Sequence, residues 1–206
     1  MGLTIWGRMN SINVQKVVWA AEEMELGYER HDAGMAFGIV NTPEYRAMNP
    51  NGLVPVIDDG GFVLWESNTI VRYLASAHGT DTLWPEDPVE RADGERWMDW
   101  QATSFYPAYA PAFMGLVRTA PDKRDMAAIE ASRAKAETLL AVLDAHLAGR
   151  DYLGARFGVA ELALGPTVHR WLNMPVARLP RPHVEAWHRR ILSRPSAACF
   201  SALPVT

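Results

Sequence analysis

Three short polar stretches of the chain carry residue types that could do chemistry. In the first, Ser11 and Asn13 stand in a loop that opens onto a helix with an apolar stripe. Free backbone N–H groups and the positive end of the helix dipole favour an anion at such a place. The Ser11 hydroxyl and the Asn13 amide add two further donors. The bland alternative is an ordinary capped helix, the commoner reason for Ser and Asn at this position.

The second stretch is Val54-Pro55, at the start of an expected strand. Proline lacks an amide hydrogen, and the bond before it adopts the cis form far more readily than other peptide bonds. A cis bond here would turn the backbone N–H and C=O of Val54 outward, where an extended peptide could pair with them. A trans proline at a strand start is the simpler alternative.

The third stretch is Glu66-Ser67, at the start of another helix. A carboxylate binds an ammonium group, while a serine hydroxyl and helix N–H groups bind a carboxylate. Together they match the two charges of a free α-amino acid group. The alternative is that Ser67 simply caps the helix and Glu66 is solvated.

These stretches sit among alternating strand and helix signals. Residues 3–6 and 28–31 are rich in strand formers, and residues 14–24 between them repeat apolar side chains at helical spacing. This order predicts two parallel strands joined by a helical crossover, with Gly27 as the helix cap. Thr42 followed by a proline predicts the start of a further short helix.

Residues 54–57 and 62–65 flank a Gly-containing turn, which predicts an antiparallel hairpin followed by a helix. Prolines after residue 84 interrupt the pattern, and only helical spacing follows, including a long apolar face over residues 129–147. We therefore predict an α+β protein. A βαβ-α-ββα domain spans residues 1–80, a linker spans 81–88, and an all-α domain spans 89–206.

Composition excludes several classes of protein. The 206 residues carry 20 Lys and Arg against 24 Asp and Glu, without the cationic stripe of a nucleic-acid binder. The single cysteine, Cys199, forbids an internal disulfide and a cysteine-built metal site, so we expect no metal and a reducing compartment. No secretory leader or membrane-spanning stretch is visible, so we expect a cytoplasmic protein without a membrane partner.

Taken in order, three elements resemble the cytosolic glutathione transferase family. They are Ser11 six residues before Val17, the run Asn-Pro-Asn-Gly-Leu-Val-Pro ending at Pro55, and Glu-Ser-Asn-Thr-Ile from Glu66. The resemblance covers essentially the whole chain, because that family joins a thioredoxin-like domain to an all-α helical bundle. Because the three motifs occur together and in the order of that family, the simpler structural explanation of each motif becomes less favourable. The chain looks bacterial and serine-type, similar to the theta, zeta and beta classes.

The resemblance implies a role for each of these residues. Val54, beside a cis Pro55, would pair with the cysteinyl backbone of glutathione, and Glu66 and Ser67 would bind its γ-glutamyl end. Ser11 would activate the thiol, with Asn13 as a second candidate. The first loop lacks the cysteine of thiol-transfer enzymes and the tyrosine of other classes.

Two positions depart from the family pattern. Leu53 stands where many relatives carry a Lys or Gln that reaches the glycyl carboxylate, and Arg8 and Lys16 are substitutes by charge only. Gly158 replaces a Ser or Thr cap before a core helix, while Glu161 keeps the reciprocal carboxylate. We expect that helix to survive at a modest cost in stability.

The expected function is a glutathione transferase of the detoxification type. It would activate glutathione, its co-substrate, as a thiolate and add it to a small apolar electrophile; a homodimer is expected. Dehalogenation, isomerisation and peroxide reduction stay open, as does a non-catalytic ligand carrier or regulatory protein of the same fold. Aromatic residues from Trp97 to Phe113 would face the acceptor or fill the core, whereas His169 and Cys199 are expected to be structural.

Overall fold

The computed structural model describes residues 2–79 and 83–206. Its first unit is a parallel pair of strands, β1 (Leu3–Trp6) and β2 (Tyr28–His31), joined by helix α1 (Ile12–Glu23). The predicted strands and their parallel pairing are confirmed. The expected cap at Gly27 is wrong, because α1 ends at Glu23 and Met24 caps it through backbone bonds to Ala20 and Glu22.

The predicted hairpin completes a sheet of four strands. Strands β3 (Val56–Asp59) and β4 (Phe62–Trp65) pair antiparallel, and the strand order is β2-β1-β3-β4 with β1 antiparallel to β3. The first hairpin strand therefore begins two residues later than expected. A short 3-10 turn η1 (Met35–Phe37) and helix α2 (Pro43–Met48) lie between β2 and β3. Helix α2 starts as predicted, since the Thr42 hydroxyl accepts from the Tyr45 amide.

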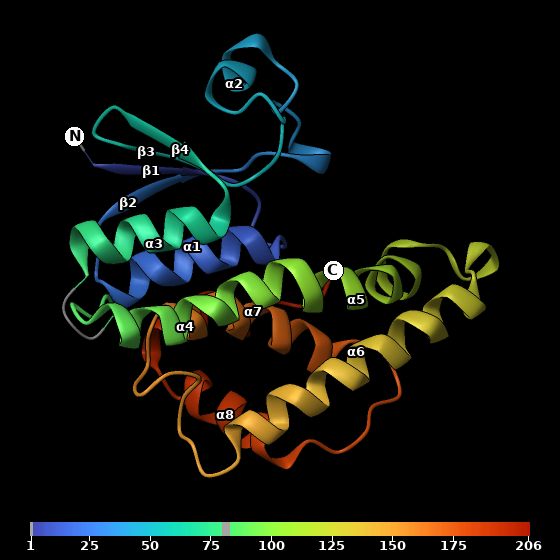
Figure 1. Ribbon diagram of the computed structural model, residues 1–206. Coiled ribbons are helices and arrows are strands. Elements are labelled where there is room, and N and C mark those ends of the chain that lie inside the picture. The colour runs from blue at the N-terminus through green and yellow to red at the C-terminus, as the bar shows by residue number, and fades with distance from the viewer. Residues whose placement is uncertain (1, 80–82) are drawn as a thin grey trace.

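Helix α3 (Ser67–His78) follows the sheet directly. Ser67 is its first helical residue rather than its cap. The cap position belongs to Glu66, whose φ of 75° lies in the left-handed region and turns the chain sharply from β4 into the helix. As Figure 1 shows, α1 and α3 cover one face of the sheet and α2 lies on the other side.

The strand register decides what meets at one end of the sheet. Trp6 of β1 pairs with Val56 of β3, which pairs with Trp65 of β4. The loop after Trp6, the residues before Val56 and the turn after Trp65 therefore leave the sheet at the same end. These are the three polar stretches, so the fold brings them together.

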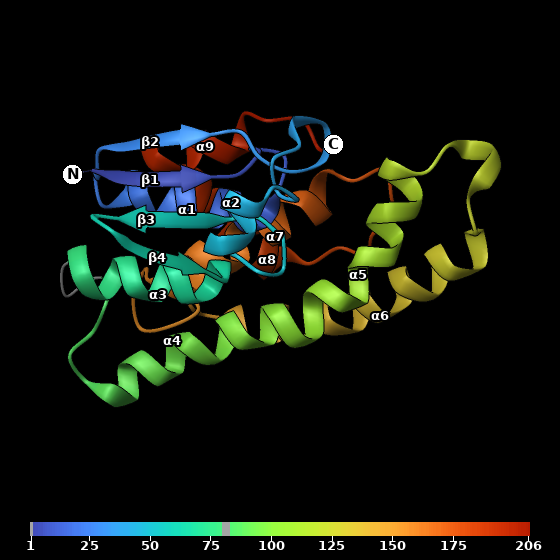
Figure 2. The same cartoon turned by 90° about the horizontal axis from the view of Figure 1, so that it is seen from above.

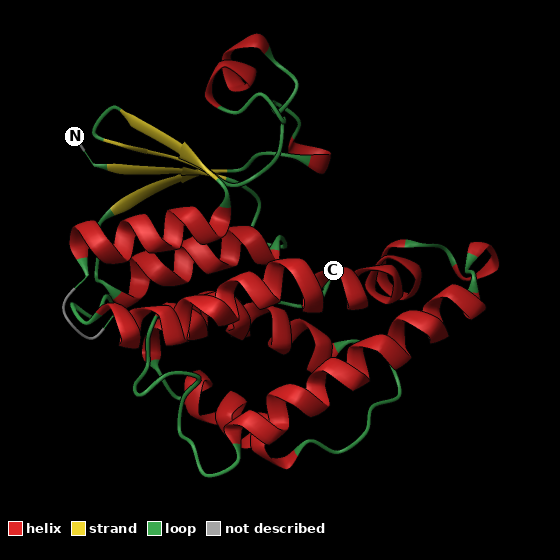
Figure 3. Cartoon of the chain, viewed as in Figure 1, coloured by secondary structure: helices red, strands yellow, loops and turns green. Residues whose placement is uncertain are grey.

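The rest of the described chain is helical (Figures 2 and 3). A nearly continuous run begins at α4 and ends in the longest helix, α6, whose predicted apolar face is buried except at Arg133, where the neighbouring Ser132 is buried instead. The elements in order are α4 (Pro88–Trp100), η2 (Gln101–Phe105), α5 (Tyr106–Phe113), η3 (Met114–Arg118), η4 (Pro121–Lys123), α6 (Met126–Leu147), α7 (Val159–Asn173), α8 (Pro182–Leu192), η5 (Pro195–Ala197) and α9 (Ala198–Ser201).

One hydrophobic core runs through both parts of the chain. Helix α1 lies between the sheet and α7, and its Trp19 is completely buried with its ring N–H donating to Ser196 Oγ at 3.0 Å. The close approach requires Gly165 on α7, because a Cβ there would collide with the Trp19 ring. The loop at the start of α1 is therefore held at a constant position relative to the helical part.

Helix α7 begins without a side-chain cap, as expected from Gly158 at its N-cap position. Its amide donates to Glu161 Oε2 at 2.9 Å, and the Leu153 amide donates to Glu161 Oε1 at 2.7 Å. Burial raises the pKa of Glu161 to about 7, although these donors act in the opposite direction. The carboxylate thus binds one buried and one partly buried backbone amide where a side-chain cap is missing.

Candidate functional site

Ser11 occupies the N-cap position of α1 but does not cap the helix with its side chain. Its backbone is extended, its amide donates to the Arg8 carbonyl at 3.2 Å, and its hydroxyl has no partner among the described residues. The hydroxyl oxygen of a capping serine would accept a hydrogen bond from a backbone amide of the first helical turn. The Ser11 hydroxyl is therefore free to donate to a ligand atom at the helix start.

Asn13, Glu66 and Ser67 border a common cavity of about 350 Å³, which also reaches Tyr106. The Glu66 side chain is exposed, while Ser67 is only 7% exposed and sits in the first turn of α3. One carboxylate beside a hydroxyl and free helix N–H groups suits a ligand with an ammonium and a carboxylate. The structure thus brings together three of the predicted residues.

Lys16 also lines this cavity, although its side chain is almost completely buried. Its ammonium donates to Gln101 Oε1 at 2.6 Å and to Asn68 Oδ1 at 3.1 Å, and Gln101 in turn donates to Thr167 Oγ1 at 3.1 Å. Burial lowers the pKa of Lys16 to about 7, and the charge of Glu66 opposes that shift. Lys16 therefore links the N-terminal part of the chain to Gln101 of the helical part. Its charge alone did not indicate this structural role.

Val54 presents an unpaired backbone at the same end of the sheet. The Val54-Pro55 bond is cis, and neither the amide nor the carbonyl of Val54 is hydrogen-bonded within the described chain. The preceding turn is fixed by two donors to the Leu53 carbonyl, the Tyr45 hydroxyl at 2.8 Å and Asn49 Nδ2 at 2.9 Å. The sequence analysis did not single out Tyr45 and Asn49, which fix this turn. The Leu53 side chain itself is 64% exposed.

The aromatic stretch divides between core and cavity. Trp97 and Phe105 are buried in the core, whereas Tyr106 is 39% exposed and reaches the cavity beside Asn13. His169 packs against His188, with 3.1 Å between ring nitrogens, and burial lowers the pKa of both. Burial raises the pKa of Cys199 to about 12, so its thiol is unreactive.

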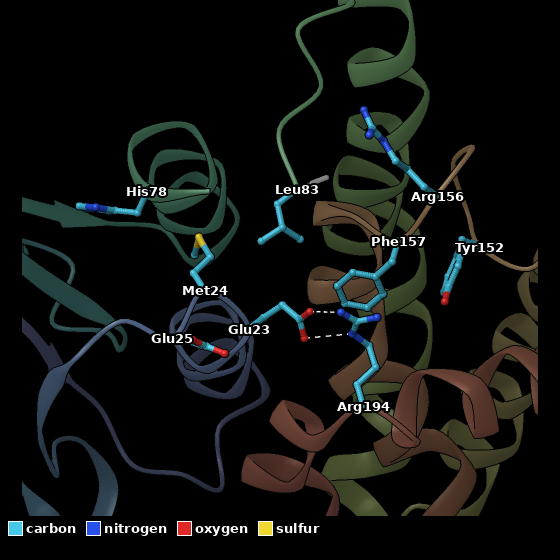
Figure 4. A pocket seen from close by; sticks show the side chains of 9 residues that line it. All are labelled: Glu23, Met24, Glu25, His78, Leu83, Tyr152, Arg156, Phe157 and Arg194. Atoms are coloured by element: carbon cyan, nitrogen blue, oxygen red, sulfur yellow. Dashed lines mark hydrogen bonds and ion pairs between the residues drawn. The ribbon is translucent and has the colours of Figure 1, made fainter. Parts of the chain in front are cut away.

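A second cavity, of about 420 Å³, lies at the far ends of α1 and α3 (Figure 4). Glu23 and Arg194 face each other across it and form an ion pair, and Arg194 also lies over the Phe157 ring at 3.9 Å. Because these charges satisfy each other, the cavity offers a ligand little polar binding. None of the residues singled out for chemistry lines it.

Two surveys of the described residues concern other classes of site. No group of three His, Cys, Asp or Glu side chains lies close enough to bind a metal ion. Within the same residues, no helix is both long and apolar enough to span a bilayer.

Comparison with known proteins identifies the family. Residues 1–76 match the N-terminal domain of glutathione S-transferases, and residues 126–190 match their C-terminal domain. The chain is 44% identical to the glutathione S-transferase GstB of Escherichia coli, over 99% of this chain and 100% of that protein. The chain belongs to the glutathione S-transferase family, with a thioredoxin-like N-terminal domain and a helical C-terminal domain.

Solved structures agree with this assignment. The theta class glutathione S-transferase of Xanthomonas axonopodis pv. citri, crystallised with glutathione bound, superposes with a TM-score of 0.96 at 45% identity, with both chains fully covered. Glutathione transferase F7 of Populus trichocarpa superposes with a TM-score of 0.86 at 26% identity, over 97% of this chain and 98% of that one.

Proposed function

We propose that this protein binds glutathione across the end of its sheet and joins it, through its sulfur, to an electrophile. The observation that carries the proposal is the unpaired backbone of Val54 at the same end of the sheet as Glu66, Ser67 and the free hydroxyl of Ser11. The tripeptide would pair its cysteinyl backbone with Val54. Glu66 would bind the γ-glutamyl ammonium, and Ser67 with the start of α3 would bind the carboxylate.

The cysteinyl sulfur would then lie at the start of α1. A charge-assisted hydrogen bond from Ser11 contributes about 1.5–3 kcal/mol, and a helix N-terminus contributes roughly 0.3–1 kcal/mol more. Divided by 1.36 kcal/mol per pKa unit, these lower a thiol pKa of about 8.5 by roughly 1.3–3 units. Ser11 acts as a donor to the thiolate and not as a base, so the thiol proton leaves to solvent.

The bound thiolate attacks an electrophilic carbon held against the helical domain. A carbon–sulfur bond forms, and the leaving group departs with its bonding electrons. Holding both reactants at this end of the sheet supplies proximity, which is the main service such a site can offer besides thiolate stabilisation. We further propose a cytoplasmic homodimer; Phe62, Val63 and Val89 are exposed apolar residues that a partner subunit would cover.

Calorimetric titration with glutathione tests the proposal, with turnover of a generic aryl halide as the second readout. We expect glutathione to bind and the Glu66→Gln variant to bind about tenfold more weakly or worse, since a charge-assisted bond is lost. The Glu44→Gln variant, on an exposed carboxylate of α2, is the matched control. A protein that neither binds glutathione nor consumes the aryl halide would instead be a carrier or regulatory member of the fold.

A further inference from the structure

Three arginines gather beside the loop that begins α1. Arg8 follows β1, Arg118 ends η3 and Arg170 lies on α7. Arg118 and Arg170 both lie over the ring of Phe113, with their guanidinium carbons 5.5 Å and 4.4 Å from its centre. Arg8 and Arg118 reach the neighbouring residues Gly34 and Met35. Positive charges from three distant parts of the chain thus meet at one place, called here the arginine cluster.

No Asp or Glu side chain pairs with the arginine cluster in the described part of the chain. Eight other arginines form ion pairs with carboxylates there, whereas these three form none. Arg170 donates to the Asn10 carbonyl at 2.7 Å, and Arg118 donates to the main-chain oxygen of Thr206, the last residue of the sequence, at 2.5 Å. The Nε atoms of Arg8 and Arg118 are buried without any partner. The cluster therefore holds donors without acceptors and three guanidinium groups that face no acidic side chain.

The environment of the cluster agrees with this charge excess. Burial lowers the pKa of Arg8, and the like charge of Arg118 lowers it further. Burial also lowers the pKa of Arg170. The groups that act in the opposite direction on Arg8 and Arg170 are the hydroxyls of Tyr106 and Tyr109, not carboxylates. A bound anion would supply the charge that these tyrosines do not.

The cluster adjoins the proposed glutathione site. Arg170 binds the carbonyl of Asn10, the residue directly before Ser11. Tyr106 connects the two places, because it reaches the cavity of Asn13 and its ring packs edge-on against Tyr109 at 5.6 Å. A molecule held by the arginines would therefore present its other end toward the Ser11 hydroxyl.

From this geometry we infer that the electrophile is an anion, with an apolar body and a carboxylate that binds Arg118 and Arg170. The inference rests on the proposed function and names the substrate class of that site. The carboxylate takes the place of the Thr206 oxygen on Arg118, since its two oxygens can accept from both guanidinium groups, whereas Arg118 and Arg170 now donate to separate main-chain oxygens. The apolar body packs on the exposed Tyr106 ring, and the carbon that bears the leaving group faces the thiolate. The small apolar electrophile expected from the sequence must therefore also carry a negative charge.

A matched pair of substrates tests the inference. In a chloronitrobenzoate and the corresponding chloronitrobenzamide, the glutathione thiolate displaces chloride from the ring, and only the benzoate is charged. Each kcat/KM is divided by the uncatalysed rate constant of the same substrate, which removes the difference in intrinsic reactivity. We expect a normalised preference for the benzoate of about tenfold or more, the effect of one charge-assisted hydrogen bond.

Variants at Arg118 test whether this residue causes the preference for the benzoate. Arg118→Gln should lower kcat/KM for the benzoate about tenfold and leave the benzamide within about twofold. Arg118→Lys should restore part of the loss, because it keeps the charge without the planar fork. Arg150→Gln removes an exposed charge at the end of α6 and should change neither substrate. The KM for glutathione should stay constant in all three variants.

A binding measurement makes the test independent of turnover. Unsubstituted benzoate should bind the glutathione-loaded protein about tenfold more tightly than benzamide, and Arg118→Gln should abolish the difference. Equal normalised rates or equal affinities for the two members of a pair would overturn the inference. So would an Arg118→Gln variant that impairs both members alike. A protein that turns over the benzamide without preferring the benzoate keeps the proposed function and loses only this inference; failure to bind glutathione would remove both.

Discussion

The substitution Ser11→Ala isolates the proposed activation of the thiol. The Ser11 hydroxyl makes no bond to the helix that it precedes, so its removal should not cost the roughly 1 kcal/mol of a lost N-cap. What is lost is one donor to a thiolate, worth about 1.5–3 kcal/mol, or roughly 1–2 units of thiol pKa. The helix N-terminus remains, so the thiol should still ionise below its solution pKa.

Ultraviolet absorbance of the thiolate in the protein–glutathione complex, followed between about pH 5 and 9, measures this pKa directly. The titration of the Ser11→Ala complex should lie about 1–2 units above that of the wild type. Glutathione affinity measured below the wild-type titration, where the thiol is protonated, should change by less than about twofold. Thermal unfolding of the free variant should match the wild type.

Asn13→Ala is the comparison variant, because Asn13 lies two residues further along the chain and borders the cavity of Glu66 and Ser67. An unchanged titration in Ser11→Ala together with a raised one in Asn13→Ala would refute the reasoning and make the amide the donor. If neither variant moves the titration, the backbone amides of α1 stabilise the thiolate alone. A destabilised Ser11→Ala variant would show that the hydroxyl caps the helix in solution.

Three further outcomes follow from the buried polar groups. Burial lowers the pKa of Lys16 from an ordinary 10.5 to about 7 in the folded protein, so between these pH values folding releases its proton. The free energy of unfolding of the wild type should therefore rise with pH in this range by about 1.4 kcal/mol per pH unit relative to Lys16→Met. Urea denaturation at several pH values measures the difference, and parallel profiles for the two proteins would contradict the prediction. Glu161→Ala should destabilise by roughly 1–4 kcal/mol, since it leaves one buried and one partly buried amide without an acceptor, while Glu130→Ala on the exposed face of α6 should leave the unfolding midpoint unchanged. Leu53→Lys should tighten glutathione binding by up to about fivefold at low salt and progressively less at high salt, because an exposed cation gains a carboxylate partner.

Much of the fold could be read from local patterns. Alternating strand and helix signals placed both parallel strands, the short helix at Thr42 and the hairpin, because each depends on near neighbours. The errors lie at element ends. The helix expected to reach Gly27 stops at Glu23, and the strand expected at Val54 begins at Val56, since tertiary packing and pairing decide such boundaries.

The candidate site divides along the same line. Ser11, Asn13, Val54, Glu66 and Ser67 could be singled out because each combines a polar or unpaired group with the start of a helix or strand. Which of them share a cavity depends on the register of three strands that are far apart in sequence. Local patterns carry no information on that pairing.

The amino-acid sequence by itself determined the order of elements, the polar residues at their starts and, through those motifs, the family resemblance. Only the tertiary structure decided that the Ser11 hydroxyl is free, that Lys16 is buried against Gln101, and that Arg118 and Arg170 share one ring without an Asp or Glu partner. The physical reason is that burial, desolvation and unpaired charge are sums over neighbours in space. These neighbours come from segments as far apart in sequence as Asn10 and Arg170, which are separated by 160 residues, and no periodicity along the chain records them.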